Sequence, residues 1–233
     1  MKRLLSVMML AAAAGTAQAQ AVDVGYPPPG SPFRDLEYKH EATVFGGYYL
    51  AAKDPAGVAP RSAPMMGIRY DLVVGGPAEF VFRLARVNSK RDVINPLNPK
   101  ATRNLGLQSW PVYLTDLGFA LNLTGQRAWH SIVPSIYTGV GIATDLDKQV
   151  DEDPFNLGTT FAFSLAGGLR FVPAGKRFQI KADASTHWYQ LKYPATYYSV
   201  TSDNTTVLDD KQAKNFWKRN LGLTLGASYL LFR

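Results

Sequence analysis

Large apolar side chains alternate with small or polar ones along stretches of about ten residues. Between residues 159 and 172, one parity holds Phe161, Phe163, Leu165, Leu169 and Phe171, and the other holds Thr160, Ala162, Ser164, Ala166, Gly168 and Arg170. A period of two predicts a β-strand whose two faces meet different environments. The polar face carries few charges, unlike a strand face in water. We therefore predict a barrel with its apolar face toward lipid and a narrow polar lumen.

Eight segments follow this pattern and are predicted to be strands: 41–51, 65–74, 78–88, 109–123, 129–143, 159–172, 178–190 and 218–232. Three connections are short and rich in Gly and Pro or polar residues, which form tight turns: 75–77, 124–127 and 173–176. The other four are long and polar: 52–64, 89–108, 144–158 and 191–217. The predicted fold is all-β: a closed antiparallel eight-stranded transmembrane β-barrel with short periplasmic turns and long extracellular loops.

In two of the predicted strands, the alternation does not decide which side chains face lipid. In the first, Val44 and Tyr48 compete with Phe45 and Tyr49 for the lipid-facing side. In the third, Arg86 shares the parity of apolar residues, which a bulge or a position at the membrane rim would explain.

The start of the chain predicts export. Lys2 and Arg3 precede an apolar stretch that is too short to span a bilayer, and Ala17-Gln18-Ala19 forms a cleavage box. We predict a signal peptide over 1–19, with a lone membrane anchor as the alternative, a Pro-rich periplasmic lead-in over 20–40, and a barrel over 41–233. The first nineteen residues hold two bases and no acid, so the formal charge of +7 becomes +5 after cleavage. That charge is too modest and dispersed to favour nucleic acid as a partner.

The chain resembles the small eight-stranded outer-membrane barrels of Gram-negative bacteria, the OmpA/OmpX/OmpW-like group, over residues 41–233. Its last strand resembles the C-terminal signal read by the barrel-assembly machinery, and the candidate residues are Thr224, Gly226, Tyr229, Leu231 and Phe232. Arg233 after the last aromatic departs from that signal. The resemblance implies a monomer in the cell outer membrane, with outer-membrane lipid, lipopolysaccharide and the assembly machinery as partners.

A soluble periplasmic barrel of lipocalin type is an alternative, because it also alternates two faces. It would expose a charged face to water. The polar face of the last strand lacks any Lys or Glu, which disfavours this alternative: Asn220, Gly222, Thr224, Gly226 and Ser228.

The predicted lumen carries ionisable side chains, and an eight-stranded barrel is just wide enough for its own side chains to fill. The candidates are Arg69, Asp71, Glu79, Arg83, Asp116, Arg170, Lys181, Asp183 and His187. Arg69 is expected opposite Arg83, with Asp71 diagonal to Arg83 and compensating both charges. We predict a network of ion pairs that plugs the lumen and a structural or surface-interaction role. A narrow pore lined by the same groups is the alternative.

Catalysis is not predicted, and no cofactor is predicted. Asp183, Ser185 and His187 follow one another on one strand face, so their side chains are expected about 7 Å apart. A catalytic triad needs contacts near about 3 Å. An enzyme that modifies lipid A by acyl transfer or deacylation remains an alternative.

The third long loop is acidic, with Asp145, Asp147, Asp151, Glu152 and Asp153. Val150 and Asn156 occupy the places of the Gly and Glu that an EF-hand requires, so we predict a solvated loop, with weak cation binding as the alternative. The second loop is basic, with Lys90, Arg91, Lys100 and Arg103. It is expected to pair with the acidic loop or to meet lipopolysaccharide phosphates.

Overall fold

The structure is a computed structural model that describes residues 31–232. The predicted signal peptide lies outside the described residues, as does the Pro-rich part of the predicted lead-in up to residue 30. Within residues 31–232, no helix is both long and apolar enough to cross a membrane. The strands and the helix belong to one compact unit, Phe33–Arg233.

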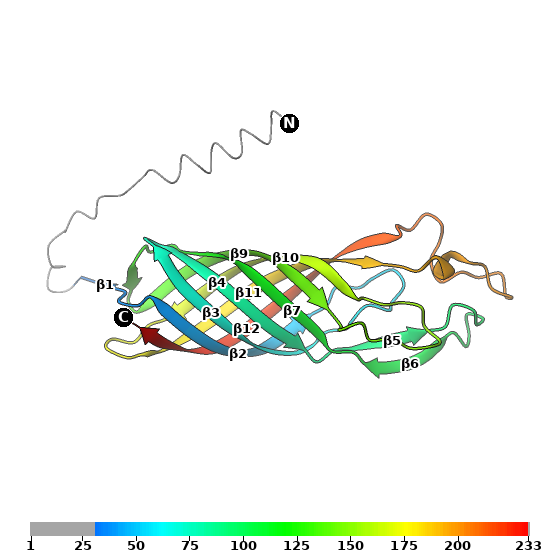
Figure 1. Ribbon diagram of the computed structural model, residues 1–233, viewed down its shortest axis with the longest axis horizontal. Helices are drawn as coiled ribbons and strands as arrows, with labels where there is room; N and C mark the ends of the chain where they lie inside the picture. The colour runs from blue at the N-terminus through cyan, green and yellow to red at the C-terminus, as the bar shows by residue number, and fades with distance from the viewer. Residues whose placement is uncertain (1–30, 233) are drawn as a thin grey trace, which may run out of the picture. The chain divides into compact units, whose positions relative to one another are not determined.

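Eight antiparallel strands form a closed barrel (Figure 1). In chain order they are β2 (His40–Leu50), β3 (Ala63–Gly75), β4 (Ala78–Val87), β7 (Val112–Asn122), β9 (Ile132–Thr144), β10 (Thr159–Phe171), β11 (Phe178–Lys192) and β12 (Asn215–Phe232). Consecutive barrel strands pair with one another, and β12 pairs with β2 to close the ring. The predicted closed antiparallel eight-stranded barrel is confirmed.

Within residues 31–232, three further strands and one short helix lie in the connections, and one more strand precedes the barrel. At the end of the barrel with short connections, the turn end, β1 (Phe33–Asp35) pairs with β8 (Arg127–Trp129). At the opposite end, the loop end, β5 (Lys90–Ile94) and β6 (Asn104–Ser109) form a separate hairpin. The 3-10 helix η2 (Ala195–Tyr198) lies in the last long loop.

Two predicted strands began too early. The strand predicted from residue 109 begins at Val112, and Ser109 is the last residue of β6. Trp129 belongs to β8, and the barrel strand β9 begins only at Ile132. His130 and Ser131 have φ angles of 46° and 66°, which is left-handed backbone that ends one strand before the next begins. The turn expected over residues 124–127 is therefore a longer connection that contains β8.

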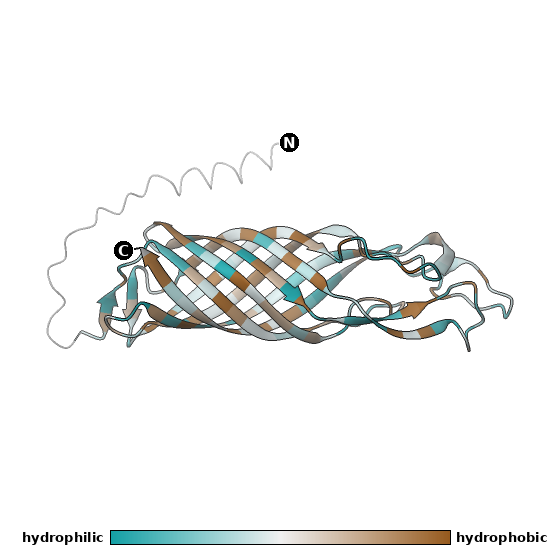
Figure 2. Cartoon of the chain, turned by 60° about the horizontal axis from the view of Figure 1, so that its bottom comes forward, coloured by the Kyte–Doolittle hydropathy of each residue, from teal (hydrophilic) through white to brown (hydrophobic). Residues whose placement is uncertain are grey.

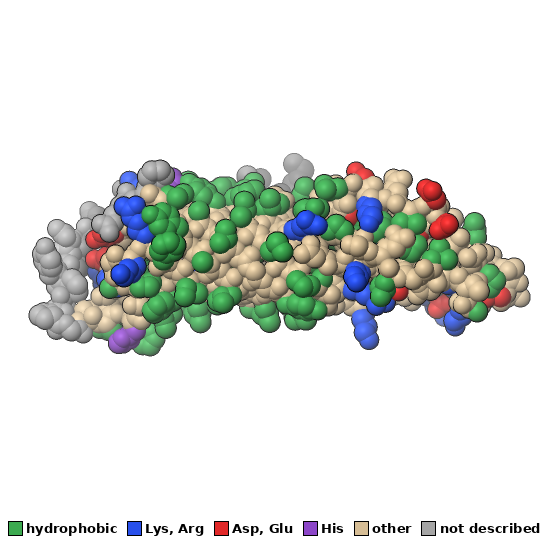
Figure 3. All heavy atoms as spheres, turned by 90° about the horizontal axis from the view of Figure 1, so that it is seen from below, with side chains coloured by type: hydrophobic (Ala, Val, Ile, Leu, Met, Phe, Trp, Pro, Cys, Tyr) green, Lys and Arg blue, Asp and Glu red, His purple; other side chains and the backbone are tan. Residues whose placement is uncertain are grey.

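The barrel exposes its apolar face and buries its polar one. On β10, Phe161, Phe163 and Leu165 are exposed, whereas Ser164 and Arg170 are buried. Figure 2 shows hydrophobic positions alternating with hydrophilic ones along the strands, and Figure 3 shows hydrophobic side chains over the barrel with Lys and Arg at both ends of this belt. The predicted inside-out arrangement, which suits a bilayer, is confirmed.

The structure decides the face of the first strand. Val44 and Tyr48 are exposed on the outer face of β2, whereas Thr43 and Tyr49 are buried. This parity also buries Glu41 inside the barrel.

The structure also decides between the two explanations of Arg86. Its side chain is exposed near the loop end of β4, with its guanidinium 5.8 Å from the centre of the Tyr113 ring. The β3–β4 register runs without a shift from Met65 to Val73. Arg86 therefore lies at the rim and not at a bulge.

Candidate functional site

The turn-end half of the lumen contains buried carboxylates bridged by two cations. Arg170 contacts Glu41 at 3.1 Å and Glu79 at 2.8 Å. Lys181 contacts Glu41 at 3.1 Å and Asp71 at 2.8 Å. All five side chains are almost fully buried. Because they come from five different strands, their contacts cross the lumen.

The same set of contacts continues through Asp71. Arg69 contacts Asp71 at 2.7 Å and Asp183 at 3.6 Å. The Tyr38 hydroxyl donates to Glu79 at 2.5 Å and also contacts Arg170. The connected ion pairs, which we name the lumen chain, run through Glu79, Arg170, Glu41, Lys181, Asp71, Arg69 and Asp183.

A second group surrounds Asp116, closer to the loop end. Arg83 donates to both oxygens of Asp116 at 3.1 to 3.2 Å, and the Ser164 hydroxyl donates at 3.0 Å. The Tyr137 hydroxyl also contacts this carboxylate. Asp116 therefore accepts hydrogen bonds from three strands, β4, β9 and β10.

The acid predicted to compensate the charge of Arg83 was the wrong one. Arg69 lies directly opposite Arg83, as predicted, but Arg83 pairs with Asp116 and Asp71 pairs with Arg69. The Tyr137 ring lies beside both cations, with its centre 5.7 Å from the Arg69 guanidinium and 5.2 Å from that of Arg83. An aromatic face stabilises cations in this way.

Glu41, which pairs with both Arg170 and Lys181 at the centre of the lumen chain, was not among the predicted lumen residues. Its strand has apolar residues on both faces, so parity alone gave no direction for its side chain. The signal available was that Val44, Tyr48 and Leu50 share one parity and exclude Glu41 from it. An acid of the opposite parity must then lie inside the barrel.

The expected separation of Ser185 and His187 was also wrong. Ser185 Oγ lies 3.1 Å from His187 Nε2, because both side chains bend toward each other inside the barrel. Both are buried, and Asp183 pairs with Arg69 instead. Among residues 31–232, no carboxylate is hydrogen-bonded to this imidazole. The pair therefore lacks the third group of a triad and an exposed face.

The four long loops pack together into a structure that we name the loop cap, formed by residues 51–62, 88–111, 145–158 and 193–214. Arg91 is fully buried within it and links two of its loops. The Arg91 guanidinium contacts Asp153 at 2.6 Å and lies 3.9 Å from the centre of the Trp110 ring. The Tyr197 hydroxyl donates to Asp153 at 2.8 Å, which joins the second, third and fourth loops. Burial, reinforced by Asp153, raises the pKa of Tyr197 well above its usual range.

The expected pairing of the basic and acidic loops is confirmed by Arg91 and Asp153. Arg103 donates instead to the Thr206 carbonyl at 2.7 Å, and the backbone N–H of Lys100 donates to Asp203 at 2.7 Å. Lys90 is exposed.

The five acids of the third loop lie in different environments. Asp145 accepts from Trp110 Nε1 at 2.8 Å, and Asp153 pairs with Arg91. Asp147, Asp151 and Glu152 are exposed. No three His, Cys, Asp or Glu side chains in residues 31–232 are grouped to hold a metal ion.

An apolar core closes the loop end of the lumen beneath the loop cap. It includes Tyr49, Leu114 and Tyr189 from barrel strands, together with Phe155 and Leu208 from the loops. The hydroxyls of Tyr49 and Tyr189 lie 3.0 Å apart. Above the lumen ion pairs, the interior is therefore filled mainly by aromatic and aliphatic side chains, with the buried polar side chains of Lys218 and Asn220 among them.

The candidate assembly residues lie on both faces of β12. Thr224 and Gly226 have the lumen-facing parity, whereas Tyr229 and Leu231 are exposed on the outer face. Phe232 ends the strand opposite His40 of β2.

Comparison with known proteins gives likeness only to solved structures. No family model matches the chain, and no curated protein matches it. One similar structure is Ail, the attachment invasion locus protein of Yersinia pestis, in complex with the heparin analogue sucrose octasulfate, with 13% identity over 82% of this chain and 99% of that one and a TM-score of 0.41. Another is a major outer membrane protein from Thermus thermophilus, with 12% identity, 83% and 98% coverage and a TM-score of 0.40.

Proposed function

We propose that the protein is an integral outer-membrane barrel that is plugged along its lumen and presents the loop cap as a rigid surface for interactions outside the cell. The observation that carries the plug is the lumen chain, in which each buried charge has an opposite charge within 4 Å. Hydrated ions would have to break these contacts to pass. The apolar core at the loop end supports the same conclusion.

The outer membrane is the proposed location because the closed barrel carries an apolar belt with polar ends. Its proposed partners are outer-membrane lipid, lipopolysaccharide on the loop side, and the assembly machinery, which would read the end of β12. The contacts of Arg91, Asp153 and Tyr197 support a loop cap that keeps one shape, because they join three loops. A preorganised surface loses less entropy on binding than mobile loops do.

We propose no catalytic role for the lumen. The Ser185–His187 contact is the strongest observation in favour of the lipid A-modifying alternative. A lipid acyl group would need to reach the Ser185 hydroxyl, which is buried among the packed side chains of the lumen. Replacing Ser185 by Ala is therefore expected to leave the acylation pattern of lipid A unchanged.

The test combines electrophoresis with conductance on the same preparation. Detergent-extracted protein, unboiled, is expected to migrate differently from the boiled sample, because a folded barrel resists the detergent. Inserted into planar bilayers, this protein is expected to give no discrete current steps. Steady current steps from a preparation with an intact folded band would replace the plug by the narrow pore. Recovery of the protein in the soluble periplasmic fraction, without a heat shift, would contradict the membrane assignment itself.

A further inference from the structure

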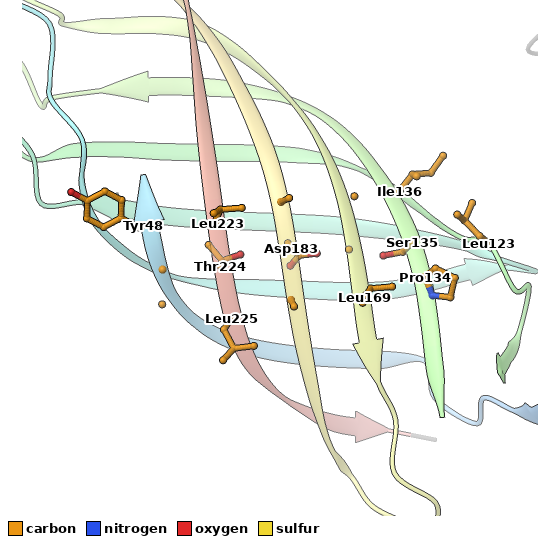
Figure 4. A pocket seen from close by; sticks show the side chains of 16 residues that line it. Tyr48, Leu123, Pro134, Ser135, Ile136, Leu169, Asp183, Leu223, Thr224 and Leu225 are labelled. Atoms are coloured by element: carbon orange, nitrogen blue, oxygen red, sulfur yellow. The ribbon is translucent and has the colours of Figure 1, made fainter. Parts of the chain in front are cut away.

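The outer face of the barrel contains a groove of about 900 Å³ that crosses β2, β12, β11, β10 and β9 (Figure 4). Its floor consists of residues with little or no side chain: Gly46, Gly167, Ala182 and Ala184. Its walls are large apolar side chains: Tyr48, Ile136, Leu169, Leu223 and Leu225. The groove lies in the apolar belt, so its occupant in a bilayer is apolar where it contacts the floor.

Strand register explains the shape of the groove. Ala184 lies opposite Gly167 on one side and Leu223 on the other, so two small residues adjoin one large residue. Leu225 in turn lies opposite Gly46 of β2. Five adjacent strands span roughly 19 Å at the usual spacing of strands. That width suits several acyl chains side by side better than a single one.

Two cations lie at the loop end of the same strands. Arg219 shares the outer face of β12 with Leu221 and Leu223, roughly 13 Å along the strand from Leu223. Lys53 follows Ala52, whose backbone N–H donates to Asn220 Oδ1 at 3.2 Å, so the backbone of Lys53 lies next to the loop end of β12, which carries Arg219.

Neither cation is neutralised by the protein. Both Lys53 and Arg219 are exposed, and neither belongs to an ion pair within residues 31–232. The neighbouring Asp54 is not paired with either of them; its carboxylate accepts hydrogen bonds from the backbone of Val58 and Ala59 and from the Tyr193 hydroxyl. Two exposed positive charges therefore remain available above the groove.

Aromatic side chains mark the level of these cations. Trp188 lies directly opposite Arg219 and stacks on Phe163, with ring centres 4.7 Å apart and planes at 9°. The ring of Trp217 lies 6.1 Å from that of Phe163. Trp side chains collect where hydrocarbon meets head groups. With the loops outside the cell, we expect Arg219 to lie at the depth of the lipid phosphates of the outer leaflet.

We propose that the groove and these cations form one docking site for a phosphorylated glycolipid with several acyl chains, of the lipid A type. Lys53 and Arg219 bind the phosphate, which an Arg guanidinium can contact through two hydrogen bonds. The acyl chains lie over Ala182, Ala184 and Gly46. The proposal rests on the outer-membrane orientation proposed above, with the loops outside the cell. The width of the groove favours such a lipid over a phospholipid with two chains.

The experiment counts the lipid molecules that stay bound to the folded protein in mild detergent, by mass spectrometry of the intact complex. Purified lipid A and phosphatidylglycerol are the two probes. Wild-type protein is expected to retain one lipid A more strongly than phosphatidylglycerol. The Lys53→Ala/Arg219→Ala variant is expected to bind lipid A about tenfold more weakly or worse, because it loses both phosphate contacts. Ala184→Leu, which fills the floor of the groove, is expected to weaken binding as well.

Two matched controls change the same residue types elsewhere. Arg86→Ala removes an exposed rim cation on β4, and Ala227→Leu enlarges an exposed outer-face position of β12 outside this groove. Both are expected to retain lipid A as the wild type does. Equal retention by the double variant, or no retention by the wild type, would overturn the site, and equal retention of phosphatidylglycerol would overturn the choice of lipid. The heat-shifted band of each preparation separates these results from failure of the barrel assignment.

Discussion

At the scale of single residues, Arg91 illustrates how the loop cap holds a charge away from water. The side chain is completely buried, and its guanidinium contacts Asp153, the Trp110 ring and the Phe155 carbonyl. A buried cation is tolerated when opposite charge and hydrogen-bond acceptors surround it. The contact therefore constrains two loops at once.

Replacing Arg91 by Met is expected to destabilise the loop cap by about 3–5 kcal/mol, because it leaves the Asp153 carboxylate buried without its cation. Faster cleavage of the loops in limited proteolysis would report this change, while the barrel keeps its heat-shifted band. Lys90→Met, at the exposed neighbouring position, is the control and is expected to leave cleavage unchanged. Equal cleavage of the two variants would contradict the role given to Arg91.

A second residue-scale prediction concerns acid. Hydrogen bonds from Thr201, the Lys100 backbone and Thr205 hold the pKa of Asp203 well below its usual range. A lowered folded-state pKa stabilises this contact above the unfolded pKa of about 3.9 and loses that stabilisation as pH falls toward the folded value. The protection of the Lys100 amide, which is its exchange rate relative to the intrinsic rate at the same pH, is expected to stay constant down to about pH 4 and to fall progressively below it. Asp203→Asn should remove this pH dependence; a dependence that persists would point to another group.

Residue positions were more predictable from sequence than residue partners. Strand parity alone places Arg69, Arg83 and Asp116 inside the barrel, where they are buried. The choice of Asp116 over Asp71 for Arg83 depends on how the two neighbouring strands β4 and β7 align, which parity does not encode. The ion-pair partner of Arg83 therefore depends on the register between β4 and β7. Closure of the whole barrel sets that register.

At the scale of elements, glycines permit the closest contact between two barrel strands. A Cβ added to Gly141 of β9 would lie 1.8 Å from the Thr115 carbonyl oxygen of β7. One added to Gly118 of β7 would lie 2.0 Å from the Thr138 oxygen of β9. Side chains at these positions would push β7 and β9 apart, so their glycines are needed for pairing.

Gly141→Ala is expected to destabilise the folded barrel by about 1–3 kcal/mol, since the added methyl group meets rigid backbone. The fraction of unboiled protein in the heat-shifted band, measured against urea concentration, checks this. Gly167→Ala is the matched control, because a Cβ there has open space around it. A Gly141 variant as stable as the Gly167 variant would show that the strands adjust without cost.

Long alternating elements were predictable, and short ones were not. The bounds of β10 and β11 differ from the predicted ones by two residues at most, because their alternation is regular from end to end. The β5–β6 hairpin lies inside a segment predicted as a loop. Its sequence Lys90–Ile94 has no alternation, since β5 is buried by packing in the loop cap on nearly all sides. Tertiary contacts, not local pattern, form that hairpin.

At the scale of the whole molecule, the barrel has an apolar exterior that suits lipid and an interior that ion pairs hold together. Burial of apolar surface drives the folding of a water-soluble protein, but here most of the large apolar side chains of the barrel face outward. Specific contacts inside the lumen must then hold one strand arrangement against others. The lumen chain joins five of the eight strands, so its removal is expected to affect the entire barrel.

Arg170→Met tests this dependence, because it removes the cation between Glu41 and Glu79 and leaves both carboxylates buried. The expected loss is about 3–5 kcal/mol of barrel stability, seen as a lower urea concentration for loss of the heat-shifted band. Arg127→Met is the control: its pair with Asp35 is largely exposed at the turn end, and its loss is expected to cost at most about 1 kcal/mol. Adding Glu79→Gln to Arg170→Met is expected to restore part of the stability, since one uncompensated charge is removed. If both arginine variants unfold at the same urea concentration, the lumen chain does not hold the strands together.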